Sequence, residues 1–283
     1  MLDDFSEQNR ARQRTFYEKF RDRLADLNSA GLTPEDRADL TILQDQIAIN
    51  LLDLTEIHSH QHSPQLYVET LGNALFAPYV LEYAPKAERI RHIVARLQKV
   101  PLYLDQAATN LMSAPDVWTQ VAVEENQGNI NLVGKEIRAG VPPDQAENYA
   151  RAARPALEAM AKFDKFLRSR LSARNTYDWR LGGNRYPRKF RYALEGGGEA
   201  DSTLQQAERD LTAVRAHMLE LALPLHHGAF PAHGDHADLS GANRENTVIG
   251  EVLAKIADRH STRESYMDDA RKALDEEIGR AHV

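Results

Sequence analysis

The stretch that decides the fold is residues 142–171, which read PPDQAENYARAARPALEAMAKFDKFLRSRL. Two prolines open it, and proline is favoured at the first position of a helix. Apolar side chains then recur three or four positions apart, which places them on one face of an α-helix, whereas a strand would show alternation. The stretch therefore predicts a long helix with one buried face, formed by Tyr149, Ala153, Ala156, Met160, Phe163, Leu167 and Leu171.

Helix-start signals of the same kind recur on both sides of this stretch. Thr33 precedes a proline and two acidic residues, and Ser63 precedes another proline, so both are predicted helix caps. The prolines that open helical patterns upstream are Pro34, Pro64, Pro85, Pro101 and Pro115. Because strand alternation is nearly absent, we expect an all-α fold, an irregular array of roughly ten helices without a β-sheet core.

The second half of the chain holds the one interruption of this pattern. A helix with Leu204, Leu211 and Met218 is expected to stop at Pro224, and residues 225–244 are then rich in His, Gly and Pro. We expect a main helical domain over residues 1–224 and an irregular loop over 225–244. A C-terminal helical pair over 245–283 is expected to pack on the main domain.

Composition excludes several classes of protein. The 283-residue chain has no cysteine, so it has no disulfide, no thiolate metal site and no cysteine nucleophile. Its apolar runs fall short of the roughly 18 residues of a membrane-spanning helix. The first residues, MLDDF, are polar and acidic where a signal peptide would be basic and then apolar. We therefore expect a cytoplasmic protein without a membrane partner.

Charge is uneven along the chain. The basic segment, residues 151–192, has twelve Lys and Arg residues against three acidic ones, a local charge of +9 in a chain of net charge −7. A positive surface could concentrate an anionic ligand, although charge runs also occur where a helix face is only solvated. Nucleic acid is not an expected partner, because phosphate-driven affinity needs a broadly basic protein.

Within the basic segment, residues 177–186 read YDWRLGGNRY and combine aromatic rings, two arginines and a glycine pair. We expect this aromatic–arginine segment to be a loop between helices, a usual location for binding residues. A structural interpretation is also open. Trp179 and Leu181 would then fill the core, Gly182 would end a turn with positive φ, and Arg180 would cap helix carbonyls.

Histidines form two groups. The first, residues 58–62, lies at a predicted helix end, where ligands would lack rigid support. The second lies in the irregular segment and could hold zinc or nickel on composition alone. Since the chain contains no His-Glu-x-x-His pair, we expect no metal site in it. The weak candidates for a metal site are His226, His227, His233 and His236.

Two separated stretches carry a family resemblance. Residues 96–115, RLQKVPLYLDQAATNLMSAP, are followed some way along the chain by residues 179–186, WRLGGNRY. Residues 51–54, LLDL, and the pair Pro64 and Tyr67 precede them in the same layout. Taken in this order, the chain resembles the bacterial family called domain of unknown function 885 (DUF885).

The resemblance implies an almost wholly helical protein of about twice this length, similar to zinc metallopeptidases of the thermolysin-like clan. In such proteins a His-Glu-x-x-Pro-Gly-His segment in the C-terminal half holds zinc and supplies the general base. This chain ends at Val283 before any such segment. We therefore expect it to be the N-terminal half only, inactive alone and without a cofactor, with zinc in the missing C-terminal half.

The function implied is that of the N-terminal helical part of a metallopeptidase-like hydrolase acting on peptides or similar amides. Its partners would be its own C-terminal half and a small peptide-like substrate. Arginine would hold a substrate carboxylate and an aromatic ring would supply an apolar platform. The expected substrate-binding residues are Trp179, Arg180, Asn184, Arg185 and Tyr186. The alternative is a non-enzymatic helical module whose basic segment holds an acidic partner.

Overall fold

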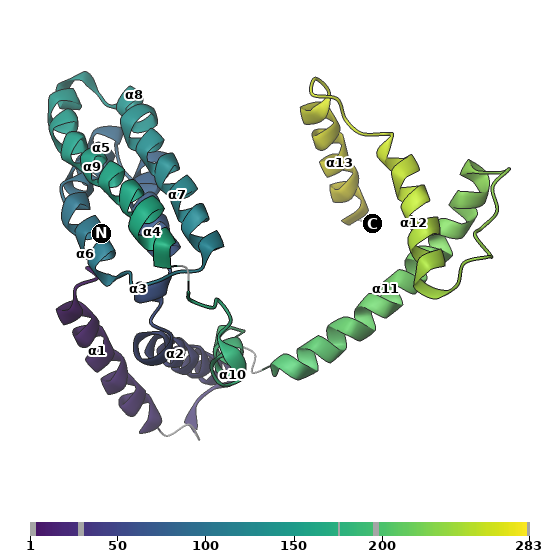
Figure 1. Cartoon of the computed structure of the whole chain (residues 1–283), viewed down its shortest axis with the longest axis horizontal. Coiled ribbons are helices and arrows are strands. Elements are labelled where there is room, and N and C mark those ends of the chain that lie inside the picture. The colour runs from purple at the N-terminus through teal and green to yellow at the C-terminus, as the bar shows by residue number, and fades with distance from the viewer. Residues whose placement is uncertain (1–3, 28–30, 175, 195–197, 282–283) are drawn as a thin grey trace. The chain divides into compact units, whose positions relative to one another are not determined.

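The computed structural model describes residues 4–27, 31–174, 176–194 and 198–281. Across these residues every regular element is a helix and no strand occurs, so the all-α prediction is confirmed (Figure 1). The chain forms two compact units, residues 1–199 and residues 200–283. The expected division at residues 224 and 244 stays a prediction.

The N-terminal unit consists of α-helices joined by short π-helical and 3₁₀ segments. The elements up to the sixth helix are α1 (Glu7–Ala25), α2 (Pro34–Leu52), the π-helix η2 (Asp53–Ile57), α3 (Ser59–His62), α4 (Pro64–Val80), α5 (Lys86–Leu97) and α6 (Val100–Asn110). The remainder are α7 (Asp116–Asn131), the π-helix η3 (Leu132–Ile137), α8 (Arg138–Gly140), η4 (Pro143–Gln145), α9 (Ala146–Phe166), the π-helix η5 (Leu167–Leu171), η6 (Ser172–Arg174) and α10 (Gly182–Ala193).

The predicted caps explain where helices begin. The Thr33 hydroxyl accepts a hydrogen bond from the Asp36 amide at 3.1 Å, and the Asp36 carboxylate accepts from the Thr33 amide at 3.3 Å. Together they satisfy main-chain donors that the first turn of α2 leaves free. Ser63 caps α4 in the same way through the Leu66 amide. Both predicted caps are confirmed.

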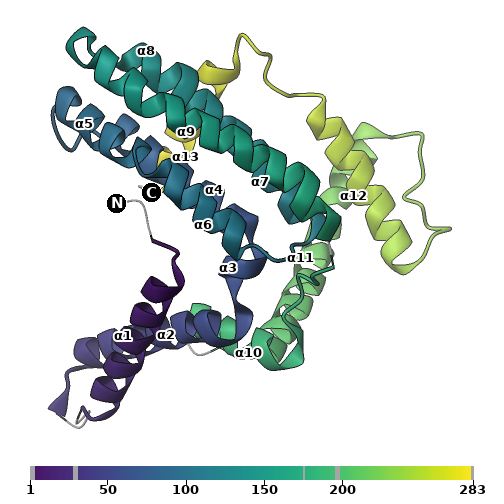
Figure 2. The same ribbon diagram turned by 60° about the vertical axis from the view of Figure 1, so that its left-hand side comes forward.

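The core of this unit lies among α4, α5, α6, α7 and α9, which run side by side (Figure 2). The face predicted for residues 142–171 is buried along its whole length, from Tyr149 to Leu171. It packs against α5, α6 and α7. The hydrophobic periodicity therefore identified the central helix and its buried face.

A widened turn interrupts the helical pattern that Pro115 opens. Its residues Leu132–Ile137 form the π-helix η3, between α7 and α8. A π-turn disturbs the regular ladder of main-chain hydrogen bonds. In this turn the Val133 carbonyl accepts a hydrogen bond from the buried Tyr149 hydroxyl at 2.6 Å. The distortion thereby joins α9 to the widened turn.

Another buried group ends a helix. Arg89 on α5 is 8% exposed, and its guanidinium donates to the carbonyls of Pro78 at 3.0 Å and Tyr79 at 2.8 Å. Those carbonyls belong to the last turn of α4, where intrahelical partners run out. A cation is also favoured at this end of a helix by the macrodipole. Arg89 thus fixes α5 to the end of α4.

The C-terminal unit contains α11 (Ala200–Ala229), α12 (Gly241–Ala257) and α13 (Tyr266–Ala281). The prediction that the first of these stops at Pro224 is wrong, because α11 continues to Ala229. An internal proline costs a helix about 3 kcal/mol. Here the turns around it pack on α12, which offsets that cost by burying Ala222 and His226.

A close approach of two helices depends on one glycine. A Cβ atom on Gly72 of α4 would lie 2.7 Å from Oδ1 of Asn129 on α7. Asn129 cannot move freely, because its side-chain amide donates to the buried Val68 carbonyl at 2.9 Å. The glycine therefore permits both the contact and the hydrogen bond.

We expect Gly72→Ala to lower the free energy of unfolding by about 1 to 3 kcal/mol, because the added methyl group overpacks the α4–α7 interface. Urea denaturation followed by circular dichroism measures this. Gly128→Ala on α7 is the matched control, since nothing lies within 4 Å of its added Cβ. The control should raise stability by about 0.5 to 1 kcal/mol through helix propensity. Equal effects of the two changes would contradict the packing argument.

Candidate functional site

The aromatic–arginine segment is part loop and part helix. The prediction of a loop through Tyr186 is wrong, because α10 begins at Gly182. Gly182 has a φ of +74°, the positive φ expected of a turn glycine. The helix is favoured beyond it because Tyr186 and Phe190, four residues apart, bring their ring centroids within 5.8 Å.

Trp179 and Arg180 lie on the outside of the unit. Trp179 is 54% exposed, so the interpretation that it fills the core is wrong. The Arg180 guanidinium lies 4.4 Å from the centre of the Trp179 ring, and Nη1 is 3.4 Å from an oxygen of Asp178. Arg180 therefore forms a cation–π contact and an exposed ion pair, in place of the expected cap on helix carbonyls.

Arg185 and Arg188 hold α10 to the π-helix η2, which follows α2. Arg185 Nη1 donates to the Glu56 carbonyl at 3.1 Å, and Arg188 Nη1 donates to the Glu56 carboxylate at 2.8 Å. The hydrogen bond from Arg188 lowers the pKa of Glu56. Arg185 thus has a structural role, whereas Asn184 and Tyr186 are exposed on the same helix.

The basic segment does not form one continuous element. Its first part lies on α9, η5 and η6, and its last part on α10, which packs on α2. The first part lines a groove of about 520 Å³ between α6 and α9, with exposed Lys162, Lys165 and Arg170 at its edge. Lys162 already pairs with Asp105 at 2.8 Å. The groove therefore offers two further cations to an anionic ligand.

The first histidine group is built into the N-terminal unit. The His62 ring stacks on Tyr177 with centroids 3.8 Å apart, and its Nδ1 lies 3.1 Å from the Ser113 carbonyl. His60 is only 6% exposed. Its burial, and then the charge of Arg10, lowers the pKa of His60 to about 4. The stacking of His62 on Tyr177 anchors the start of the aromatic–arginine segment. Burial keeps His60 neutral.

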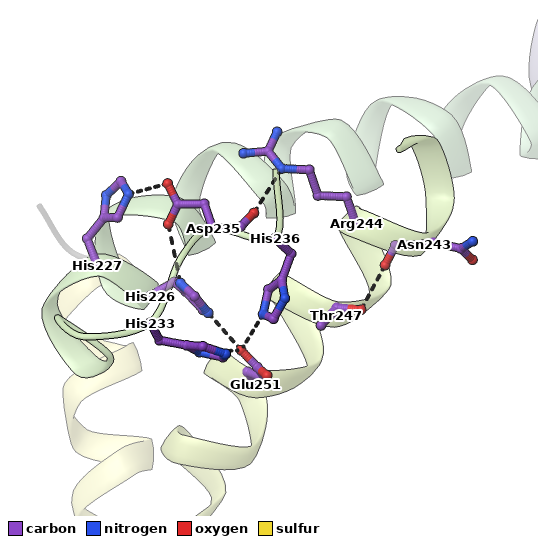
Figure 3. A network of polar contacts seen from close by, with 9 residues as sticks. All are labelled: His226, His227, His233, Asp235, His236, Asn243, Arg244, Thr247 and Glu251. Atoms are coloured by element: carbon purple, nitrogen blue, oxygen red, sulfur yellow. Dashed lines mark hydrogen bonds and ion pairs between the residues drawn. The ribbon is translucent and has the colours of Figure 1, made fainter. Parts of the chain in front are cut away.

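The second histidine group gathers around one carboxylate (Figure 3). His226 lies near the end of α11, His233 and His236 follow in the connecting segment, and Glu251 lies on α12. Nε2 of His226 is 2.7 Å from Glu251 Oε2, Nε2 of His236 is 3.0 Å from it, and Nδ1 of His233 is 3.5 Å from it. These hydrogen bonds, with that from His236 the largest cause, lower the pKa of Glu251. We name these four residues the histidine–glutamate cluster.

Asp235 lies behind this cluster. Its Oδ1 is 3.4 Å from Nδ1 of the fully buried His226, and its Oδ2 contacts Nε2 of His227. The contact with His227 lowers the pKa of Asp235. Arg244 donates to the Asp235 carbonyl at 3.0 Å and so fixes the segment. Of the four predicted candidates, the structure therefore brings three to the Glu251 carboxylate. The fourth, His227, contacts the Asp235 carboxylate.

The model of a bacterial protein family of unknown function, DUF885, matches residues 1–282. The chain belongs to the DUF885 family. Among curated proteins no relative matches it. One solved structure, a "putative lipoprotein of unknown function" from Shewanella oneidensis, shares the fold with a TM-score of 0.73 and 20% identity.

The match to the Shewanella structure covers all of this chain but only part of that protein. It covers 100% of the DUF885 chain and 51% of the Shewanella chain, so this chain spans about half the length of its structural neighbour. None of the helices in the described part of the chain has the length and apolar character needed to cross a bilayer. The predicted family is confirmed, and the fold is shared with part of a longer protein.

Sequence reasoning missed the acidic members of both sites in this DUF885 chain. Glu251 lies on a helix that the pattern did predict, but its neighbours give no sign that it meets three histidines. Glu56 is likewise far in sequence from the arginines that it binds. The one available signal was the short spacing of Asp235 from the histidines on either side, since carboxylates often orient imidazole rings.

We expect acid to destabilise the DUF885 chain through His60. An unfolded histidine has a pKa near 6.5, whereas that of His60 in the fold is about 4. Between these values the unfolded state binds more protons, so the free energy of unfolding falls as pH falls. The loss from pH 7 to pH 5 should be about 1 to 2 kcal/mol, measured by urea denaturation at each pH. His60→Gln should remove this loss, and the exposed His92→Gln should retain it; an unchanged pH dependence in His60→Gln would rule the mechanism out.

Proposed function

We propose that this chain is the N-terminal helical part of a metallopeptidase-like hydrolase, and that it binds peptide or amide substrates for a catalytic half outside it. The observation that carries the proposal is the exposed pair of Trp179 and Arg180 beside an anchored helix. The Arg180 side chain is 66% exposed, and α10 next to it is held through Glu56. An exposed cation beside an aromatic surface suits a substrate carboxylate and an adjoining apolar group.

An exposed apolar face on α11 supports a partner for the C-terminal unit. The spacing of its exposed apolar residues is that of the a and d positions of a coiled-coil seam, which a partner helix would cover. These residues are Leu204, Leu211, Val214, Met218, Leu221 and Leu225. We propose the C-terminal half of the same protein as that partner, because the structural neighbour is about twice as long as this chain.

The groove beside Lys165 and Arg170 favours a second candidate function. A helical module without enzymatic activity could bind an acidic ligand there, at the first part of the basic segment. Such a module needs neither zinc nor a catalytic half. The cytoplasmic location and the absence of a nucleic-acid partner stay predictions under either function.

The two functions make different predictions for the longer protein that carries this chain. We expect that protein to hydrolyse peptides in a zinc-dependent reaction, and the chain alone to be inactive. Arg180→Ala should raise the KM for peptides with a free carboxylate by about 10- to 100-fold, because a hydrogen bond to a charged group is lost. The kcat should change little, since the contact would bind the substrate and the transition state equally well.

Arg14→Ala is the matched control, because Arg14 is also an exposed arginine in an ion pair, with Glu18 at 2.8 Å. Its KM should equal that of the unchanged protein. Zinc-loaded longer protein that cleaves no peptide would refute the hydrolase function. A KM that Arg180→Ala leaves unaltered would remove Arg180 from the substrate site.

A further inference from the structure

We propose that the histidine–glutamate cluster of the C-terminal unit binds one zinc ion, which joins α11 to α12. Its donors are three imidazole nitrogens and one carboxylate oxygen, all within 4.8 Å of one another. Imidazole and carboxylate are zinc ligands in proteins, and four protein ligands are typical of a structural site. This ion would be distinct from the catalytic zinc that the proposed function places outside this chain.

The distances from the Glu251 carboxylate to the three imidazole nitrogens suit zinc. Ligand atoms at about 2.0 to 2.1 Å from a tetrahedral zinc lie about 3.3 Å from one another. The three imidazole nitrogens lie 2.7, 3.0 and 3.5 Å from Oε2 of Glu251. These three values bracket the edge of such a tetrahedron. All four donor atoms lie within 4.8 Å of one another, so the imidazole nitrogens that lie farther apart than this edge would close in around the ion.

The same oxygen is crowded without an ion. A carboxylate oxygen offers two lone pairs, whereas three imidazole rings point at Glu251 Oε2. Zinc removes this conflict, because each nitrogen and the oxygen then donate to the metal in place of competing for one acceptor. The side chains of His233 and Glu251 are 43% and 31% exposed, which leaves a path for the ion from solvent.

Asp235 supplies the outer support that histidine ligands require. His226 is fully buried, and its Nδ1 and Asp235 Oδ1, 3.4 Å apart, have no hydrogen-bond partner among the described residues. Zinc on Nε2 of His226 would place the ring proton on Nδ1, facing that oxygen. A carboxylate behind a ligating histidine is the common arrangement in zinc sites.

The C-terminal unit also has a small hydrophobic core among its described residues. Its described residues bury four hydrophobic side chains between α11 and α12: Ala222, Val248, Ile249 and Val252. Small units with so small a core commonly gain stability from a metal or a disulfide. This chain has no cysteine, so a disulfide is excluded. A zinc ion at the end of α11 would supply the missing constraint.

The test is zinc binding by the untagged chain of 283 residues, titrated against a chelating dye after removal of metal. We expect one zinc per chain and a higher thermal unfolding midpoint with zinc present. Glu251→Gln and His233→Ala should each weaken binding by about 10- to 100-fold or more, and Asp235→Asn by about 10-fold. Cobalt(II) in the same site should give the visible absorption of tetrahedral coordination.

His217→Ala is the matched control, because His217 also lies on α11 but pairs with the exposed Glu220. It should bind zinc like the unchanged chain. Glu251→Gln preserves shape, so the test holds even where His233→Ala fails to fold. Absence of stoichiometric zinc binding by the unchanged chain would overturn the proposal, as would unchanged affinity in Glu251→Gln.

Discussion

Hydrogen bonds from buried side chains to main-chain carbonyls decide how the helices of the N-terminal unit lie against one another. Apolar packing alone would allow neighbouring helices to slide or rotate at small cost. A buried donor cannot do so without losing its partner, which costs more than the bond itself stabilises. Tyr149, Asn129 and Arg89 each reach a carbonyl on another helix or helix end. The arrangement of the helices from α4 to α9 depends on these bonds.

Hydrophobic spacing and caps predicted most helices because both are local properties of the chain. The buried face of α9 and the box of Thr33 and Asp36 follow directly from residues within a few turns of one another. α10 escaped prediction since glycine and arginine dominate it, and what fixes it is Glu56, far away in sequence. Pro224 misled for the same reason: the burial that keeps α11 intact comes from α12.

In the two candidate sites, too, the sequence predicted what local composition shows and missed what distant contacts decide. The histidines near residue 230 stand out by composition, and three of them do meet. Glu251 could not be selected, because a single acidic residue on an amphipathic helix resembles any solvated carboxylate. Trp179 shows the opposite error. A large aromatic side chain is usually buried, but Trp179 is 54% exposed and its ring lies against the Arg180 guanidinium. Exposure of that ring is information that only the folded chain contains.

The π-helical turn η3 has a consequence for the length of the chain. Between Leu132 and Ile137 it holds one residue more than an α-helical turn needs, and both the preceding α7 and the turn itself, through Val133 and Ile137, contribute to the core. A single-residue deletion there would close the turn to a regular helix and leave the buried face of α7 facing inward. Anywhere else in the same helix such a deletion would rotate one flank by about 100° and expose it. This turn is therefore a place where related chains can differ by one residue and still share the fold, at the expense of the Tyr149 contact.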